Sequence, residues 1–253
     1  MMRTIAICNQ AGGVGKTTTT RDLGYELMLC GFKVFVLDAD SQGSLGEYLG
    51  CHPHQRPAEE MFWSSLCNDT ATPAHVVEKY DLWVGLSNLQ LAKGERLLVQ
   101  QRNPMKLYGA LQNFQAQFDF ILIDCPPHIS EMTVQALIAA DEILIPVQTE
   151  DKAVAGLQLI QEEIIEANKR RLYVRPPLKL TGILPTLYDA RLNLHRHYLG
   201  EVQRTAEQLG CQVFQPVRRA IAVAEACNAR VPLKLYSPSC PVNEDMELLA
   251  KAL

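Results

Sequence analysis

The stretch Asn9–Thr20, with the sequence NQAGGVGKTTTT, decides the fold expected for this chain. It follows the apolar run RTIAIC at residues 3–8 and precedes a segment of helical character. In a glycine-rich loop between a strand and a helix, successive backbone N–H groups can surround a phosphate. The pattern therefore predicts a phosphate-binding loop rather than a chance glycine turn.

The residue types in this loop have separate roles in nucleotide binding. Glycine allows the backbone to approach an anion closely. Lys16 supplies charge for the β- and γ-phosphates, the Thr17 hydroxyl is a ligand for Mg²⁺, and the helix that starts at Lys16 adds its N-terminal field. The predicted nucleotide-binding residues of the loop are Gly12, Gly13, Val14, Gly15, Lys16, Thr17 and Thr18.

Apolar runs alternate with helical segments along the chain. Near-continuous apolar runs are typical of strands buried on both faces, and this alternation predicts an α/β fold with a doubly wound, mostly parallel sheet. The predicted strands are 3–8, 33–38, 118–124, 142–148 and 178–184, and the predicted helices are 16–31, 91–117, 130–140, 154–171, 192–210 and 241–252. The region 51–88 is the least regular. We expect a single P-loop ATPase domain over residues 1–253.

Aspartates follow two of the later predicted strands. VLDAD places Asp38 and Asp40 at the carboxyl edge of the strand at 33–38, and FILIDCPP places Asp124 at the end of another. One aspartate in such a position is usually a turn residue. Carboxyl ends of parallel strands meet at one edge of a sheet, so three aspartates together with the loop favour a Mg²⁺-nucleotide site. Asp124 is the predicted metal residue, acting through water.

The composition excludes other classes of protein. With 253 residues, 47% of them hydrophobic, the chain can bury a sizeable core. It has no apolar run of membrane-spanning length and no signal-like N-terminus, so we expect a cytoplasmic protein. The 8 cysteines form no CxxC pair and match no zinc or haem spacing, which indicates reduced, apolar cysteines.

The charge of the chain is unevenly distributed. The window 168–234 contains 12 Lys and Arg against 4 Asp and Glu, a net charge of +8, whereas the whole chain carries −4. Such polarity indicates a candidate anion-binding surface on an otherwise acidic protein.

Several motifs occur in a familiar order. They are GGVGKTT at 12–18, DADSQG at 38–43, DCPP at 124–127, GILPTLYDAR at 182–191 and VFQPVRRAIAVAEA at 213–226. With these motifs the chain resembles the ParA family of partition ATPases, which belong to the deviant-Walker branch of P-loop NTPases. The resemblance covers nearly the whole chain and is weakest in 51–115.

The resemblance implies ATP and Mg²⁺ as cofactors, an ATP-sandwich homodimer and slow ATP hydrolysis. It also implies non-specific DNA binding by the ATP form on the nucleoid, with stimulation by a ParB-like or cargo-bound adaptor. On this chain, Lys16 and Asp40 become the catalytic residues, with Asp40 orienting or activating the attacking water, and Thr17 and Asp124 serve Mg²⁺. We assign Val217 and Arg218 to the nucleotide site, and Arg191, Arg218 and Arg219 to DNA.

Ala11 departs from the family pattern, which has a second lysine at this position that reaches phosphate across the dimer interface. Either the protein does not dimerise on ATP in the usual way, or another cation replaces that lysine. We favour Lys152, since TEDK carries the chain over the nucleotide-side edge after the strand at 142–148. An ion pair of Lys152 with Glu150 or Asp151 is the alternative. The carboxysome-positioning, McdA-like branch also lacks this lysine, which makes that branch the candidate within the family.

Two other functions remain as alternatives. A metabolic deviant-Walker enzyme is one, either a phosphoryl-activating ligase or a nucleotide-driven electron donor, although Cys125 alone resembles a buried spacer more than a cluster ligand. A membrane-cycling regulator like MinD is the other. It needs a basic amphipathic C-terminal helix, whereas the tail NEDMELLAKAL is acidic, so we expect no membrane partner.

Overall fold

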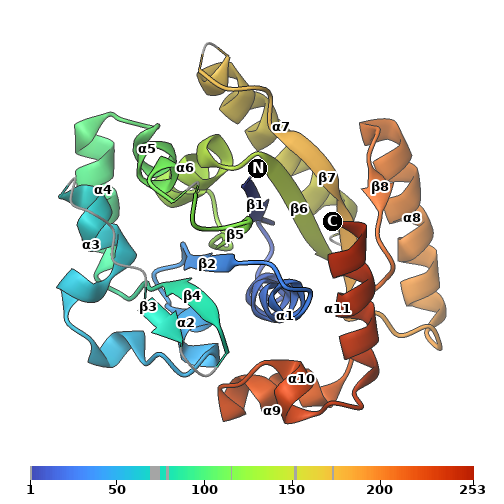
Figure 1. Ribbon diagram of the computed structural model, residues 1–253. Coiled ribbons are helices and arrows are strands. Elements are labelled where there is room, and N and C mark those ends of the chain that lie inside the picture. Colours follow the sequence, from blue (N-terminus) through green and yellow to red (C-terminus); the bar gives the residue numbers. More distant parts are fainter. Residues whose placement is uncertain (1, 69–74, 78–79, 115, 151–152, 173) are drawn as a thin grey trace.

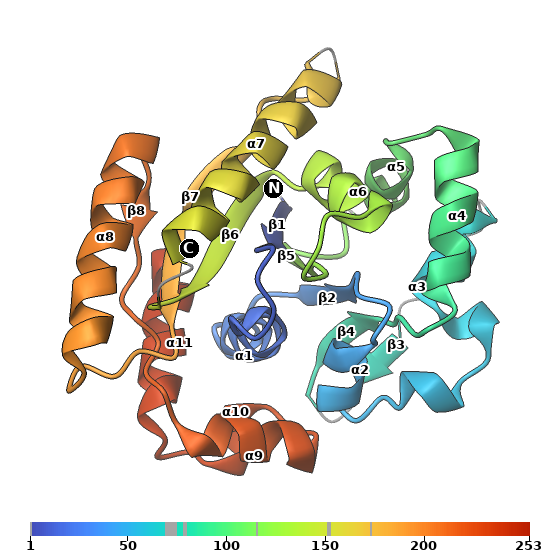
Figure 2. The same cartoon turned by 180° about the vertical axis from the view of Figure 1, so that it is seen from behind.

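The computed structural model describes residues 2–68, 75–77, 80–114, 116–150, 153–172 and 174–253. Its centre is one 8-stranded sheet in the order β3-β4-β2-β5-β1-β6-β7-β8 (Figures 1 and 2). The strands are β1 (Arg3–Ile7), β2 (Val34–Asp38), β3 (His75–Val77), β4 (Leu82–Gly85), β5 (Phe120–Asp124), β6 (Glu142–Gln148), β7 (Lys179–Thr186) and β8 (Gln212–Val213). Every pair of neighbours is parallel except β3 with β4. The predicted doubly wound, mostly parallel sheet is confirmed.

Helices cover both faces of the sheet (Figures 1 and 2). The α-helices are α1 (Lys16–Leu29), α2 (Ser44–Tyr48), α3 (Phe62–Cys67), α4 (Leu91–Gln101), α5 (Lys106–Gln112), α6 (Glu131–Ala139), α7 (Ala153–Arg171), α8 (Asn193–Leu209), α9 (Ile221–Ala229), α10 (Leu233–Tyr236) and α11 (Pro241–Ala252). Two 3₁₀ turns, η1 (Pro53–Gln55) and η2 (Ala58–Glu60), lie between α2 and α3.

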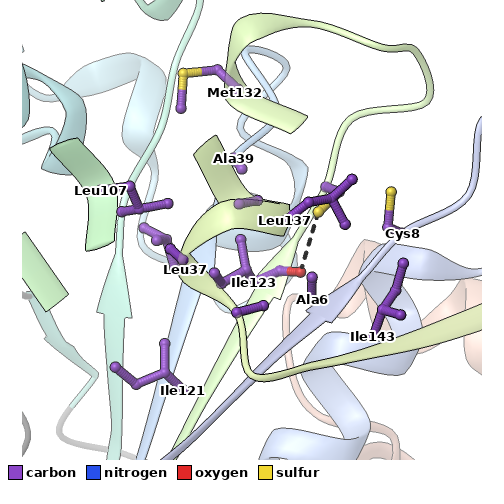
Figure 3. Close-up of a cluster of buried hydrophobic side chains, with 14 of the residues drawn as sticks. Ala6, Cys8, Leu37, Ala39, Leu107, Ile121, Ile123, Met132, Leu137 and Ile143 are labelled. Atoms are coloured by element: carbon purple, nitrogen blue, oxygen red, sulfur yellow. Dashed lines mark hydrogen bonds between the residues drawn. The ribbon is translucent and has the colours of Figure 1, made fainter. Parts of the chain in front are cut away.

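Alternation of side chains along the strands creates two apolar cores. Ala6 of β1 faces one core, whereas its neighbours Ile5 and Ile7 face the other. The first core packs β-strand residues against α3 to α8, and Figure 3 shows part of it, where Leu107, Met132 and Leu137 cover the sheet. The second packs the opposite face against α1, α2 and α9 to α11. Burial on both faces explains the near-continuous apolar runs in the sequence.

The strand register brings the ends of β1, β2 and β5 level with one another. Ile7 pairs with Asp124, and Asp124 pairs in turn with Asp38. The chain segments that leave these strands therefore start from one edge of the sheet, and these segments include the glycine loop. Trp63 of α3 supports this edge, because its indole Nε1 donates to the Asp38 carbonyl at 2.9 Å.

The structure differs from the predicted elements mainly between residues 44 and 117. The predicted helix 91–117 is two helices, because Arg102 has a φ of 50° and ends α4 just before Asn103 and Pro104. The region 51–88, described above as least regular, contains α3 and the strands β3 and β4, and α2 lies just before it; the sequence predicted none of these elements. Also unpredicted are β8, α9 and α10. The predicted end of the first helix is accurate, since Gly31 follows α1 with a φ of 93°.

Candidate active site

A cavity of about 670 Å³ lies at the carboxyl edge of the sheet, between the glycine loop and α9. Ligands bind at this edge in doubly wound folds. The lining residues are Gly12, Gly13, Gly15, Lys16, Thr17, Thr18, Asp40, Tyr48, Cys125, Pro127, Leu187, Arg219, Ala220, Ile221, Val223, Ala224, Cys227 and Asn228. We call this space the nucleotide cavity. It brings together most of the loop residues predicted from the sequence, as well as Asp40.

Local backbone geometry explains the glycines of the loop. Gly13 and Gly15 have φ values of 75° and 83°, in the left-handed region that side chains disfavour. A Cβ at Gly15 would also lie 3.3 Å from the Thr18 Oγ1 atom. The loop is fixed from the other side by Thr186, whose hydroxyl donates to the Val14 carbonyl at 2.8 Å. The Val14 side chain is buried, and Val14 does not line the nucleotide cavity, unlike the other predicted residues of the loop.

Lys16 is positioned before any phosphate arrives. Its side chain is buried, and its Nζ donates to the carbonyl of Ala11 at 2.7 Å. Burial lowers the pKa of Lys16, while Asp124 acts in the opposite direction. A desolvated ammonium beside exposed glycine N–H groups attracts phosphate strongly. The backbone of position 11 therefore orients Lys16, although its side chain lacks the cation typical of the family.

Asp124 is almost fully buried beside Lys16 and Thr17. Neither of its carboxylate oxygens has a hydrogen-bond partner within the described residues. Burial raises the pKa of Asp124 to about 7, with the nearby Thr17 hydroxyl and Lys16 ammonium acting in the opposite direction. A divalent cation would favour the charged form, and hard oxygen donors suit Mg²⁺. Asp124 does not itself line the cavity, so contact through water or through Thr17 fits this arrangement.

The two aspartates after β2 differ in role. Asp38 is fully buried, and its carboxylate accepts the backbone N–H groups of Asp40 and Leu45 at 3.0 Å each. Burial, reinforced by the nearby Asp124 carboxylate, raises the pKa of Asp38. Asp40 lines the nucleotide cavity, and its Oδ1 accepts the N–H of Gln42 at 3.0 Å. Asp38 therefore stabilises the segment that follows β2, from Asp40 to Leu45, whereas Asp40 is placed to act on a molecule bound in the cavity.

Two residues assigned to the nucleotide from the sequence lie elsewhere in the structure. The Val217 side chain is buried in the second apolar core. The guanidinium of Arg218 binds Asp245 at 2.7 Å and Glu244 at 2.9 Å, both on α11. Neither residue lines the nucleotide cavity, because α11 holds Arg218 and the core holds Val217. Lys152 lies outside the described residues.

The basic window is not one continuous surface. The guanidinium of Arg171 is buried and donates to carbonyls at the end of α6, and Arg175 binds the same region. Lys234 pairs with Glu26 at 2.8 Å. Arg191 is different, because its side chain is 88% exposed even though it pairs with Asp189 at 2.7 Å. Arg191, Arg218 and Arg219 line a second cavity of about 470 Å³, which we call the arginine cavity.

Comparison with known proteins agrees with this geometry. A family model described as an AAA domain matches residues 2–179. The chromosome partitioning protein ParA of Myxococcus xanthus (strain DK1622) is 35% identical over 237 residues, which cover 92% of this chain and 81% of that protein.

Two solved structures are similar over nearly the whole chain. Cobyrinic acid a,c-diamide synthase from Mycobacterium smegmatis, with bound ATP analog and magnesium, is 29% identical with a TM-score of 0.85, over 99% of this chain and 93% of that one. Apo McdA from Cyanothece is 22% identical with a TM-score of 0.87, over 100% and 99% of the two chains. At that identity the likeness to McdA shows a shared fold.

The glycine loop, the parallel sheet and the matching family model define a P-loop ATPase. Within that class, the chain belongs to the ParA-type family of partition ATPases. In the described part of the chain, no helix has the length and apolar character needed to cross a membrane.

Proposed function

We propose that this chain binds Mg²⁺-ATP, dimerises around it, and binds DNA without sequence preference until an adaptor stimulates hydrolysis. The observation that carries this proposal is the nucleotide cavity, in which Lys16, Thr17 and Asp40 face the same space. The solved relative from Mycobacterium smegmatis, with its ATP analog and magnesium, supports the choice of ligands. A cycle of this kind would distribute a cargo (a plasmid, a chromosome region or a carboxysome) over the nucleoid.

Each side chain has a separate task in this proposal. Lys16 and the glycine N–H groups hold the phosphates, and Thr17 with Asp124 would hold Mg²⁺. When bound, the ion neutralises charge that develops on the phosphate oxygens. Asp40 accepts a hydrogen bond from the attacking water and orients it toward the phosphate. Because Asp40 begins the turn that contains Gln42, the position of its carboxylate depends on that turn.

The proposed dimer needs a cation in place of the lysine missing at position 11, and Lys152 is our candidate for ATP-dependent dimerisation. Lys152→Ala is expected to raise the dimer dissociation constant in ATP at least about tenfold, because a charge-assisted contact to phosphate is lost. Sedimentation with ATP measures this effect. Lys179→Ala, at the amino end of β7, is the matched control. A Lys152→Ala protein that dimerises at parental affinity would remove Lys152 from the proposal.

DNA binding is a separate step of this proposal, and Arg191 is its first candidate because its side chain is 88% exposed, against 44% for Arg218. Arg191→Glu is expected to weaken binding of random-sequence DNA at least about tenfold with ATP present, since a phosphate contact becomes a repulsion. Fluorescence anisotropy at several salt concentrations measures both affinity and salt slope. Arg170→Glu on α7 makes the same charge change elsewhere. Binding that ignores salt or tolerates Arg191→Glu would contradict this assignment.

A metabolic ligase is the second candidate, because the Mycobacterium smegmatis relative bears a synthase name. A ligase would hydrolyse ATP only when a small-molecule carboxylate or amine acceptor is present. A partition ATPase would instead hydrolyse ATP faster when DNA and a protein adaptor are present. ATPase assays with each addition in turn separate the two functions.

A further inference from the structure

Arg219 is a cation that lines the nucleotide cavity, although the sequence analysis assigned it to DNA binding. Its side chain is exposed and lines that cavity together with Lys16 and Asp40. Within the part of the chain that the structure describes, no acceptor pairs with its guanidinium. The other two arginines assigned to DNA differ, since Arg191 is held by Asp189 and Arg218 by Asp245 and Glu244.

The backbone around Arg219 is fixed relative to the phosphate-binding loop. Its N–H donates to the Tyr188 carbonyl at 2.9 Å, and the Tyr188 N–H donates to the Val217 carbonyl at 3.0 Å. The residue before Tyr188, Leu187, also lines the cavity and has a φ of 53°. Next to it, Thr186 binds the carbonyl of Val14 in the loop. The hydrogen bonds of Arg219 with Tyr188 and of Thr186 with Val14 therefore connect the backbone of Arg219 with the glycine loop.

The nucleotide cavity has few cations to balance the charge of a triphosphate. Among the described residues that line it, the cations are Lys16 and Arg219, and Asp40 is an anion. The triphosphate of ATP carries several negative charges, and Ala11 contributes none of the positive charge that a lysine there would supply. A guanidinium is suited to phosphate because it forms two parallel hydrogen bonds and keeps its charge.

We propose that Arg219 binds a phosphate group of the ATP held in its own subunit. This inference rests on the proposed function and deepens it, because it names the second cation of the same site. Arg219 also lines the arginine cavity, so this residue borders both the nucleotide cavity and the cavity that contains the other two arginines assigned to DNA. A DNA contact is the rival assignment, and nucleotide affinity measured without DNA distinguishes the two.

The test measures displacement of a fluorescent ATP analogue by ATP and by inorganic tripolyphosphate, with Mg²⁺ and without DNA. Arg219→Ala is expected to weaken both competitors about tenfold or more, the size of a lost charge-assisted contact. Arg219→Lys keeps the charge and should recover part of the loss. Arg170→Ala, on the outer surface of α7, should keep parental affinities. Thermal unfolding without nucleotide checks that each variant folds.

Other outcomes have defined meanings. Parental affinity of Arg219→Ala for both competitors overturns the inference. A loss for ATP but not for tripolyphosphate places Arg219 on the base or sugar, and it also overturns the phosphate role. If the parental protein binds ATP and Lys16→Ala does not, while Arg219→Ala is unaffected, this inference alone fails. If the parental protein binds no ATP, the proposed function itself fails.

Discussion

Asp40→Ala is expected to slow ATP hydrolysis at least about 100-fold, the contribution usually made by a positioned acid–base group. ATP affinity should stay near the parental value, because Lys16 and the glycine N–H groups hold the phosphates. Asp40 lines the nucleotide cavity at the edge where the ends of β2 and β5 meet, and we propose that it orients a water there beside the terminal phosphate. Single-turnover hydrolysis together with a binding isotherm measures the two effects separately.

A second variant distinguishes chemistry from structure at Asp40. Its Oδ1 accepts the N–H of Gln42, so alanine also removes a hydrogen bond from that turn. Asp40→Asn keeps an oxygen acceptor for Gln42 and removes the carboxylate charge. If both variants lose hydrolysis, the charge is required. If Asp40→Asn hydrolyses ATP at the parental rate and only Asp40→Ala is impaired, Asp40 stabilises the turn and the catalytic role is wrong.

Lys16→Ala should produce the largest loss of nucleotide affinity, about 100-fold, because a buried ammonium at the loop is replaced by a methyl group. Burial lowers the pKa of Lys16, because removing the ammonium from water disfavours its charged form. A bound phosphate would offset this loss of hydration. The variant should therefore fold at least as stably as the parent in the absence of nucleotide. Isothermal titration with ATP, accompanied by thermal unfolding, tests both statements.

Lys16→Met is the matched control for shape, since it keeps a long side chain but removes the charge and the Nζ donor to the Ala11 carbonyl. The two variants should lose ATP affinity equally if charge is the cause. ATP binding at parental affinity by either one would contradict the assignment of the phosphate site.

Much of the fold could be predicted because its strands are buried on both faces. The runs that became β1, β5 and β6 are long and almost wholly apolar, and the glycine loop identifies the strand before it. β4 was missed because LWVG is only four residues long and lies at the edge of the parallel strands, where Trp83 is partly exposed. β3, which pairs with β4 in the antiparallel direction, carries even less signal.

The far wall of the site was not predictable from the sequence. Ala224, Cys227 and Asn228 line the cavity from α9, more than two hundred residues after the loop, and small residues of this kind suggest no chemistry. The sequence gives the number of charged residues but does not show which of them form ion pairs. Arg218 was assigned to nucleotide and DNA from its motif, and only the packing of α11 shows that Asp245 and Glu244 bind it.

Sedimentation velocity of the parental protein, with and without ATP and with and without random-sequence DNA, tests the proposed ATP-dependent cycle. We expect a monomer without ATP, a dimer with Mg²⁺-ATP, and a DNA complex that forms only when ATP is present. A protein that stays monomeric with saturating ATP, or that binds DNA equally well with and without ATP, would contradict it.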